Sequence, residues 1–145
     1  MKTTVATLGP IGYLPAPGTL ATGVTMLAIL CMQAVTSSML IYSAAFIVLI
    51  MGAFWSIPAA VRQLHNGADP KQIVIDEAIG TLVTFLGLSL TCSNVLIGFL
   101  LFRLFDIYKP WPICVIEKLP GTWGIILDDI VAGLCALMVL HLLFL

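Results

Sequence analysis

Charged side chains are scarce in this sequence. Six of the 145 residues are Lys or Arg and seven are Asp or Glu, so charged residues make up 9% of the chain, while 61% are hydrophobic. Soluble domains carry about 25% charged residues, so the composition excludes an ordinary water-soluble fold and indicates an integral membrane protein. The formal net charge of -1 provides no basic surface for nucleic acid.

Several signals of other protein classes are also missing. No Gly-x-x-x-x-Gly-Lys loop is present, which argues against a nucleotide-driven kinase. The four cysteines lack the spacing of a metal site, and no general base follows Cys114 at a recognisable spacing, so thiol catalysis is disfavoured. Pro10, Pro15 and Pro17 interrupt the stretch where a signal peptide would have its apolar core. We therefore expect residues 1–19 to form an ordered loop or interfacial segment.

Long apolar runs are what the sequence does contain. Because lipid offers backbone groups no hydrogen-bond partner, such runs are expected to be helical. They cover residues 19–35, 39–57, 73–91, 95–105 and 124–145. The prediction is an all-α bundle of about five transmembrane helices, forming one membrane-embedded domain over 1–145. Short uncharged stretches at 36–38 and 92–94 predict tight turns between helices.

The run 95–105 is shorter than the ~20 residues that a spanning helix usually needs. A re-entrant or buried segment is one interpretation of it. Extending the run to 94–108 gives a tilted span, with Arg103 snorkelling from its end. We adopt this second interpretation because it gathers the charged residues at one end of the bundle.

The charged residues share one side of the membrane if all five runs span it. The basic residues on that side are Lys2, Arg62, Lys71, Arg103, Lys109 and Lys118. The positive-inside rule assigns that side to the cytoplasm. The acidic residues there are Asp69, Asp76, Glu77, Asp106, Glu117, Asp128 and Asp129. The orientation rule does not require the acids to follow the bases, so their grouping indicates a chemical role.

Two acidic pairs open apolar runs. Asp76 and Glu77 begin the third run, and Asp128 and Asp129 lie near the start of the fifth. A helix N-terminus favours one anion, but adjacent residues point about 100° apart, so one carboxylate of each pair must face the bundle or lipid. Gly80, four residues after Asp76, leaves that face open to a neighbouring helix or a ligand. Carboxylates at this depth favour a functional interpretation.

The composition of these pairs bears on the metal they would hold. Carboxylate clusters without histidine or cysteine favour hard cations, and magnesium suits oxygen ligands that leave room for phosphate. His65 lies in a polar connection and His141 near the far end of the last run. Zinc is therefore disfavoured.

The stretch "FRLFDIYKPWPI" places two bases and an acid three residues apart. On a helix Arg103 and Asp106 share one face, and Lys109 continues that line before Pro110 ends the helix. One interpretation is a snorkelling helix end with aromatic interfacial anchors. The other is a phosphate site, since cations beside metal-binding carboxylates neutralise phosphate oxygens.

The stretch "LPAPGTL" combines two prolines with a glycine before the first apolar run. Thr19 is expected to cap the first helix. Contact with a phosphate is the alternative.

The motifs "APGT", "DPKQIVIDEAIG", "FRLFDIYKPWPI" and "GIILDDIVAG", in this order, resemble the phosphatidylglycerophosphatase A family. The resemblance runs from about residue 9 to 133. It implies a magnesium-dependent, multi-pass phosphatase of the bacterial inner membrane, with its active site facing the cytoplasm. The implied reaction removes the terminal phosphate of phosphatidylglycerophosphate to give phosphatidylglycerol. The substrate would be this phospholipid, and no protein partner or oligomeric state is implied.

The resemblance also implies the site residues. The implied metal ligands are Asp76, Glu77, Asp106, Asp128 and Asp129. The implied catalytic residues are Asp76, Arg103, Asp106, Lys109 and Asp129. Of these, Arg103 and Lys109 would bind the phosphate. A covalent aspartyl-phosphate and direct attack by water both remain open. The alternative function is a small ion- or proton-coupled transporter that uses the same carboxylates.

Overall fold

The computed structural model describes residues 1–36, 38–64 and 70–144, and the regular structure of these residues is helical throughout. The elements in chain order are α1 (Lys2–Ala6), the 3-10 helix η1 (Ile11–Tyr13), α2 (Pro17–Val35), α3 (Met39–Leu64), α4 (Ile75–Thr84), α5 (Cys92–Tyr108), α6 (Ile113–Ile116) and α7 (Thr122–Phe144). This confirms the all-α prediction. His65 and Asp69 lie outside the described residues.

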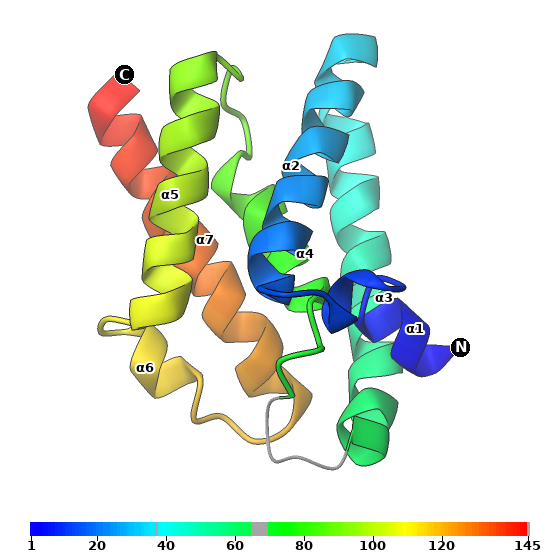
Figure 1. Ribbon diagram of the computed structural model, residues 1–145. Coiled ribbons are helices and arrows are strands. Elements are labelled where there is room, and N and C mark those ends of the chain that lie inside the picture. The colour runs from blue at the N-terminus through cyan, green and yellow to red at the C-terminus, as the bar shows by residue number, and fades with distance from the viewer. Residues whose placement is uncertain (37, 65–69, 145) are drawn as a thin grey trace.

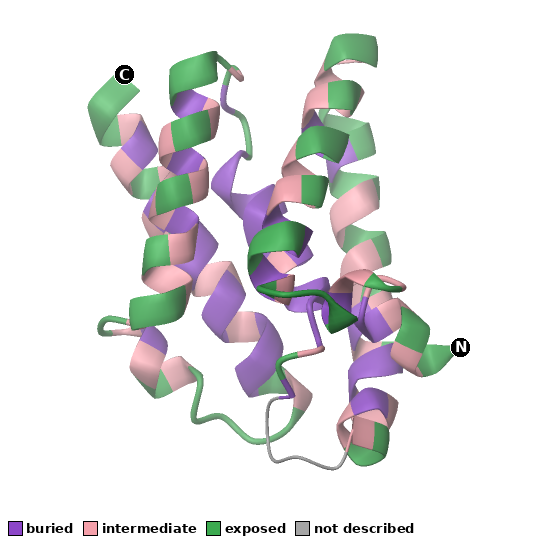
Figure 2. Cartoon of the chain, viewed as in Figure 1, coloured by how far each residue is buried: buried purple, intermediate pink, exposed green. Residues whose placement is uncertain are grey.

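Helices α2, α3 and α7 are long and apolar enough to cross a membrane. Many large apolar side chains on the outward faces are exposed, among them Val48 at 67% and Leu96 at 61%. Figure 2 shows the contrast with α4 and the inner face of α7, where burial is concentrated. A surface this apolar is suited to lipid rather than water. The structure thus supports a membrane protein with three helices of spanning character.

The long helices α2, α3, α5 and α7 extend along the long dimension of the molecule, and the short α4 lies among them (Figure 1). Helix α4 packs against α7, α2 and α3. The end of α5, α6 and the start of α7 lie at one end of the molecule, and the chain's C-terminus lies at the other (Figure 1). Helix α6 therefore lies at the end of the molecule where α5, which carries Arg103 and Asp106, ends and α7, which carries Asp128 and Asp129, begins (Figure 1).

Helix α4 departs from the expectation for residues 73–91. A single spanning helix was expected, but α4 has 10 residues, a length of about 15 Å against a hydrocarbon core of about 30 Å. Gly87 adopts a left-handed conformation with φ of +73° in the irregular segment that follows. Every residue of α4 except Glu77 is buried. In the irregular segment that follows, Phe85 and Leu88 are buried, whereas Leu86, Gly87 and Ser89 are exposed.

Two other boundaries differ from the expectation. The stretch 92–94 is not a turn but the first turn of α5, where Thr91 caps the helix by accepting a hydrogen bond from the Asn94 backbone N–H. Helix α3 continues through Pro58 to Leu64. Proline removes one backbone donor, and a helix supported by neighbours accommodates that loss. A turn was expected at 36–38; α2 ends at Val35 and α3 begins at Met39, and Ser37, in the middle of that stretch, lies outside the described residues.

Two glycines allow α4 and α7 to cross closely. A Cβ atom on Gly80 would lie 2.6 Å from the Asp129 carbonyl oxygen, and one on Gly133 would overlap the Gly80 carbonyl oxygen. This confirms that Gly80 admits a neighbouring helix. Each glycine lies four residues after an acid, Gly80 after Asp76 and Gly133 after Asp129. The crossing therefore brings acids of the two helices to the same place.

Candidate active site

A polar cavity of about 480 Å³ lies where four segments meet: the start of α2, the start of α4, the end of α5 and the first turns of α7. Its polar lining includes every residue that the sequence predicted as a metal ligand or catalytic residue. These are Asp76, Glu77, Arg103, Asp106, Lys109, Asp128 and Asp129. The structure thus brings all seven together, from α4, from α7, and from α5 and its C-cap.

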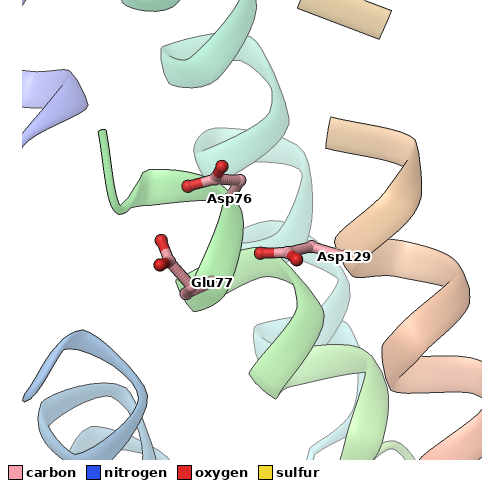
Figure 3. A group of neighbouring side chains, drawn as sticks. All are labelled: Asp76, Glu77 and Asp129. Carbon is pink, nitrogen blue, oxygen red and sulfur yellow. The ribbon is translucent and has the colours of Figure 1, made fainter. Parts of the chain in front are cut away.

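Three carboxylates form the centre of this cavity. One oxygen each of Asp76, Glu77 and Asp129 lies within 4.8 Å of the others. Figure 3 shows Asp76 and Glu77 projecting from the start of α4, with the Asp129 carboxylate directed toward them from α7. Asp76 and Asp129 are only 6% and 3% exposed. We refer to these three residues as the acidic triad.

The acidic triad is electrostatically incomplete on its own. Within residues 1–36, 38–64 and 70–144, Glu77 Oε2 and Asp129 Oδ2 are buried without a hydrogen-bond partner. The pKa of Glu77 is raised to about 7, mainly by burial. The negative charge of Asp106 also raises this pKa, whereas a hydrogen bond with Asp76 and the positive charge of Arg103 lower it. Buried anions need a compensating cation. An oxygen-only donor set with uncompensated oxygens could hold a hard cation.

Two cationic side chains flank the acidic triad. Arg103 donates a hydrogen bond from Nη1 to Asp106 Oδ2 at 2.5 Å, while its Nε is buried with no partner among the described residues. Lys109 donates from Nζ to Asp128 Oδ2 at 2.6 Å and to Glu117 Oε1 at 2.8 Å. Both cations are therefore held in place by acids, and Arg103 keeps a donor for a further acceptor.

The position of Lys109 differs from the expectation of a continuous helical line. Helix α5 ends at Tyr108, and Lys109 is its C-cap in a left-handed conformation. This turn directs the ammonium group toward α7, where Asp128 accepts its hydrogen bond. Burial lowers the pKa of Lys109, but hydrogen bonds to Asp128 and Glu117 outweigh burial, and the pKa is raised above its usual value. Lys109 is thus firmly protonated.

The start of α2 forms another wall. Thr19 does not cap this helix: Ala16 is the N-cap, without a side-chain hydrogen bond, and the helix begins at Pro17, a position that proline favours. The first turn leaves backbone N–H groups of Gly18 and Thr19 without intrahelical acceptors. A Cβ on Gly18 would overlap Glu77 Oε1 and lie 3.1 Å from both Arg103 terminal nitrogens. Only glycine lets α2 approach the acidic triad this closely.

The chain matches the family model described as phosphatidylglycerophosphatase A over residues 4–144. The chain belongs to the phosphatidylglycerophosphatase A family. The match confirms the resemblance seen in the sequence and covers all of the elements that line the cavity.

Individual relatives are similar over different lengths. The chain is 40% identical over 75 residues to phosphatidylglycerophosphatase A of Escherichia coli, covering 50% of this chain and 44% of the relative. It is 41% identical over 73 residues to the Haemophilus influenzae protein of the same name, covering 49% and 45%. A Bacteroides thetaiotaomicron protein, whose name proposes a phosphatidylinositol-3-phosphatase, is 29% identical over 134 residues, covering 84% and 80%. The matches thus span under half the length of the first two relatives. No solved structure matches the chain.

Some cavity residues were missed by reasoning from sequence. Lys71, which is exposed, lines the cavity, and so do Ala16, Pro17 and Gly18. Lys71 stands in the family motif "DPKQIVIDEAIG", five residues before Asp76. That placement beside a site motif was the available signal. For the start of α2 the signal was the motif "APGT" and the alternative role of Thr19 as a phosphate contact, and Thr19 does line the cavity.

Replacing Lys109 by alanine is expected to destabilise the protein. The substitution removes the ammonium that bonds Asp128, whose side chain is only 5% exposed. Loss of a hydrogen-bonded partner from a buried charge costs about 1–3 kcal/mol. We expect Lys109→Ala to unfold several degrees below the wild type in detergent, measured by tryptophan fluorescence. Lys118→Ala, at an exposed position, is the matched control, and equal melting of the two variants would contradict the assignment.

Proposed function

We propose that the chain is a magnesium-dependent lipid phosphatase that hydrolyses the terminal phosphomonoester of phosphatidylglycerophosphate, giving phosphatidylglycerol and phosphate. Residues 1–145 would act as a single domain. The observation that carries the proposal is the combination, in one cavity, of the acidic triad with Arg103, Lys109 and the start of α2. Phosphoryl transfer requires such positioned cations.

The acidic triad would hold the metal ion. Bound there, magnesium would supply positive charge to the phosphate oxygens as negative charge develops on them. Asp106 and Asp128 line the same cavity but already engage Arg103 and Lys109. We therefore propose that their main role is to orient these two cations.

The protein's own donors would bind the rest of the phosphate. Arg103 offers its buried Nε, and the start of α2 presents backbone N–H groups with the positive end of the helix dipole. Lys109 lines the same cavity and is held by Asp128 and Glu117. Donors fixed before the substrate arrives need no reorganisation during the reaction, which is the main electrostatic source of catalysis.

The cavity is proposed to face the cytoplasm from the bacterial inner membrane. Lys71, Arg103 and Lys109 line the cavity, and basic residues collect on cytoplasmic sides. In a cysteine-free protein, Lys118→Cys should react with a membrane-impermeant thiol reagent in inverted vesicles and not in intact spheroplasts. The reverse labelling pattern would place the cavity on the other side.

The transporter alternative is less well supported. Transporters place their carboxylates near the bilayer midplane, commonly at broken helices. Here the acids lie near the N-terminal ends of α4 and α7 and the bases at the C-terminal end of α5, so the cavity is built from helix ends. We propose that a headgroup phosphate binds among these helix ends.

The proposed reaction can be tested with purified protein in detergent. We expect release of inorganic phosphate from phosphatidylglycerophosphate with magnesium, loss of release with a chelator, and recovery when excess magnesium is added. Phosphatidylinositol 3-phosphate is the competing substrate, because one relative carries that activity in its name. Faster phosphate release from the inositol lipid would show that this lipid is the preferred substrate. Phosphate release that persists with the chelator would contradict the proposed metal dependence.

A further inference from the structure

A second hollow lies between α2 and α5, on the outer surface of the bundle. It is a groove of about 850 Å³ with an almost wholly apolar lining, a size within the range of about 300–1,000 Å³ typical of small-molecule sites. On α2 its wall includes Leu20, Gly23 and Leu27, and on α5 it includes Leu96 and Phe99. The α2 residues recur at helical spacing, so they share one face.

The groove adjoins the polar cavity. Thr19 lines both, and Phe99 lies one turn before Arg103 on α5. Helix α2 begins at the cavity and α5 ends there, so the two walls of the groove leave the cavity together. From Leu20 to Leu27 the groove extends about 10 Å along α2.

Gly23 makes room in this groove. An ideal Cβ atom placed there would meet no atom within 4 Å. Leu27 and Leu96 line the groove yet remain 60% and 61% exposed, so the protein itself does not cover them. An apolar groove beside a cavity that holds Arg103, Lys109 and a proposed metal site matches an amphiphile with an anionic head and an apolar tail.

We propose that the α2–α5 groove binds an acyl chain of the lipid whose phosphate occupies the polar cavity. This inference rests on the proposed function and extends it, because it says where the acyl chain of the substrate binds on the lipid-facing surface of the protein. The phosphate lies among Arg103, Lys109 and the start of α2, the glycerol backbone passes Thr19, and the chain runs between the two helices. The groove thereby selects for membrane lipids over soluble phosphate esters.

The first test fills the groove without touching the polar cavity. Gly23→Leu projects a side chain into the open space, and Ala44→Leu is the matched control on an exposed face of α3 that does not line the groove. The measured quantity is kcat/KM for dipalmitoyl phosphatidylglycerophosphate divided by kcat/KM for the dihexanoyl lipid. We expect Gly23→Leu to lower this ratio at least roughly tenfold, the effect of about two CH₂ groups losing burial. An unchanged ratio, or an equal fall in Ala44→Leu, overturns the proposal.

The second test does not depend on activity. One equivalent of phosphatidic acid with a photoreactive diazirine in its acyl chain is added to the protein in detergent, and the labelled peptides are mapped by mass spectrometry. We expect labelling of the facing segments 20–27 and 92–99, reduced in Gly23→Leu and retained in Ala44→Leu. Labelling spread equally over the outer face of α3 overturns the groove. Groove labelling by a protein that releases no phosphate would refute the proposed reaction and leave the lipid site standing.

Discussion

Asp129→Asn is expected to lower magnesium-dependent phosphate release on the order of 10³-fold. The Asp129 carboxylate is 3% exposed and faces Asp76 and Glu77 across the α4–α7 crossing (Figure 3). Asparagine keeps the size of the side chain and removes one anionic ligand. Weakened metal binding costs several kcal/mol of transition-state stabilisation, and each ~1.4 kcal/mol corresponds to a factor of ten in rate.

The same variant should fold and insert normally. Asp129 carries a buried oxygen without a hydrogen-bond partner in the described part of the chain, so loss of its charge relieves repulsion within the acidic triad. Glu117→Gln is the matched control, since Glu117 is an acid at the same end of the molecule with a 46% exposed side chain, where ion pairs contribute little. We expect it to retain activity within about threefold. Asp129→Asn retaining more than a tenth of wild-type phosphate release would reject the acidic triad as the metal site.

Gly80→Ala is expected to impair stability and activity together. The added methyl group would lie 2.5 Å from Phe102 Cε2 and 2.6 Å from the Asp129 carbonyl oxygen. The carbonyl belongs to the backbone of α7, so it cannot move away alone. Overpacking of this kind costs about 1–3 kcal/mol. Separation of α4 from α7 would also pull Asp129 away from Asp76 and Glu77, and a shift of about 1 Å in such a site costs roughly 10²-fold in rate.

Gly52→Ala is the matched control for this prediction. Gly52 also lies inside a helix, but its Cβ would find its nearest neighbour, Ile75 Cδ1, at an ordinary 3.5 Å. We expect Gly52→Ala to melt at or above the wild-type temperature, since alanine favours helix by up to about 1 kcal/mol over glycine. Melting temperature and phosphate release should be measured on both variants. Similar behaviour of the two would show that the α4–α7 crossing does not organise the site.

The grouping of acids and bases could be predicted from the sequence because charge is costly in lipid. Polar motifs separated by apolar runs must return to a membrane surface, and counting those runs placed Asp76, Arg103 and Asp128 on one side. The count assumed five spanning runs, whereas three of the described helices are long and apolar enough to span. The structure gathers the same residues around one cavity. The grouping of these residues follows from the order of apolar and polar segments and from the cost of placing charge in lipid.

The closer geometry could not be predicted in the same way. A helix surrounded by lipid and a helix buried in protein are both apolar, so their sequences look the same. The sequence therefore did not distinguish the ten-residue, buried α4 from a spanning helix. The acceptor of the Lys109 ammonium, Asp128, lies 19 residues further along the chain. The contact of Gly18 with Glu77 likewise depends on where α2 begins. Such details are set by tertiary packing rather than by local pattern.

The central claim is that the folded bundle creates one metal site from carboxylates of α4 and α7. Manganese, a paramagnetic substitute for magnesium, should be titrated into the purified protein and into Asp129→Asn, with bound ion measured by electron paramagnetic resonance. The account predicts a saturable bound fraction in the wild type that magnesium displaces and that is lost in Asp129→Asn but kept in Glu117→Gln. Equal binding by the wild type and Asp129→Asn, or no binding by the wild type, would contradict it.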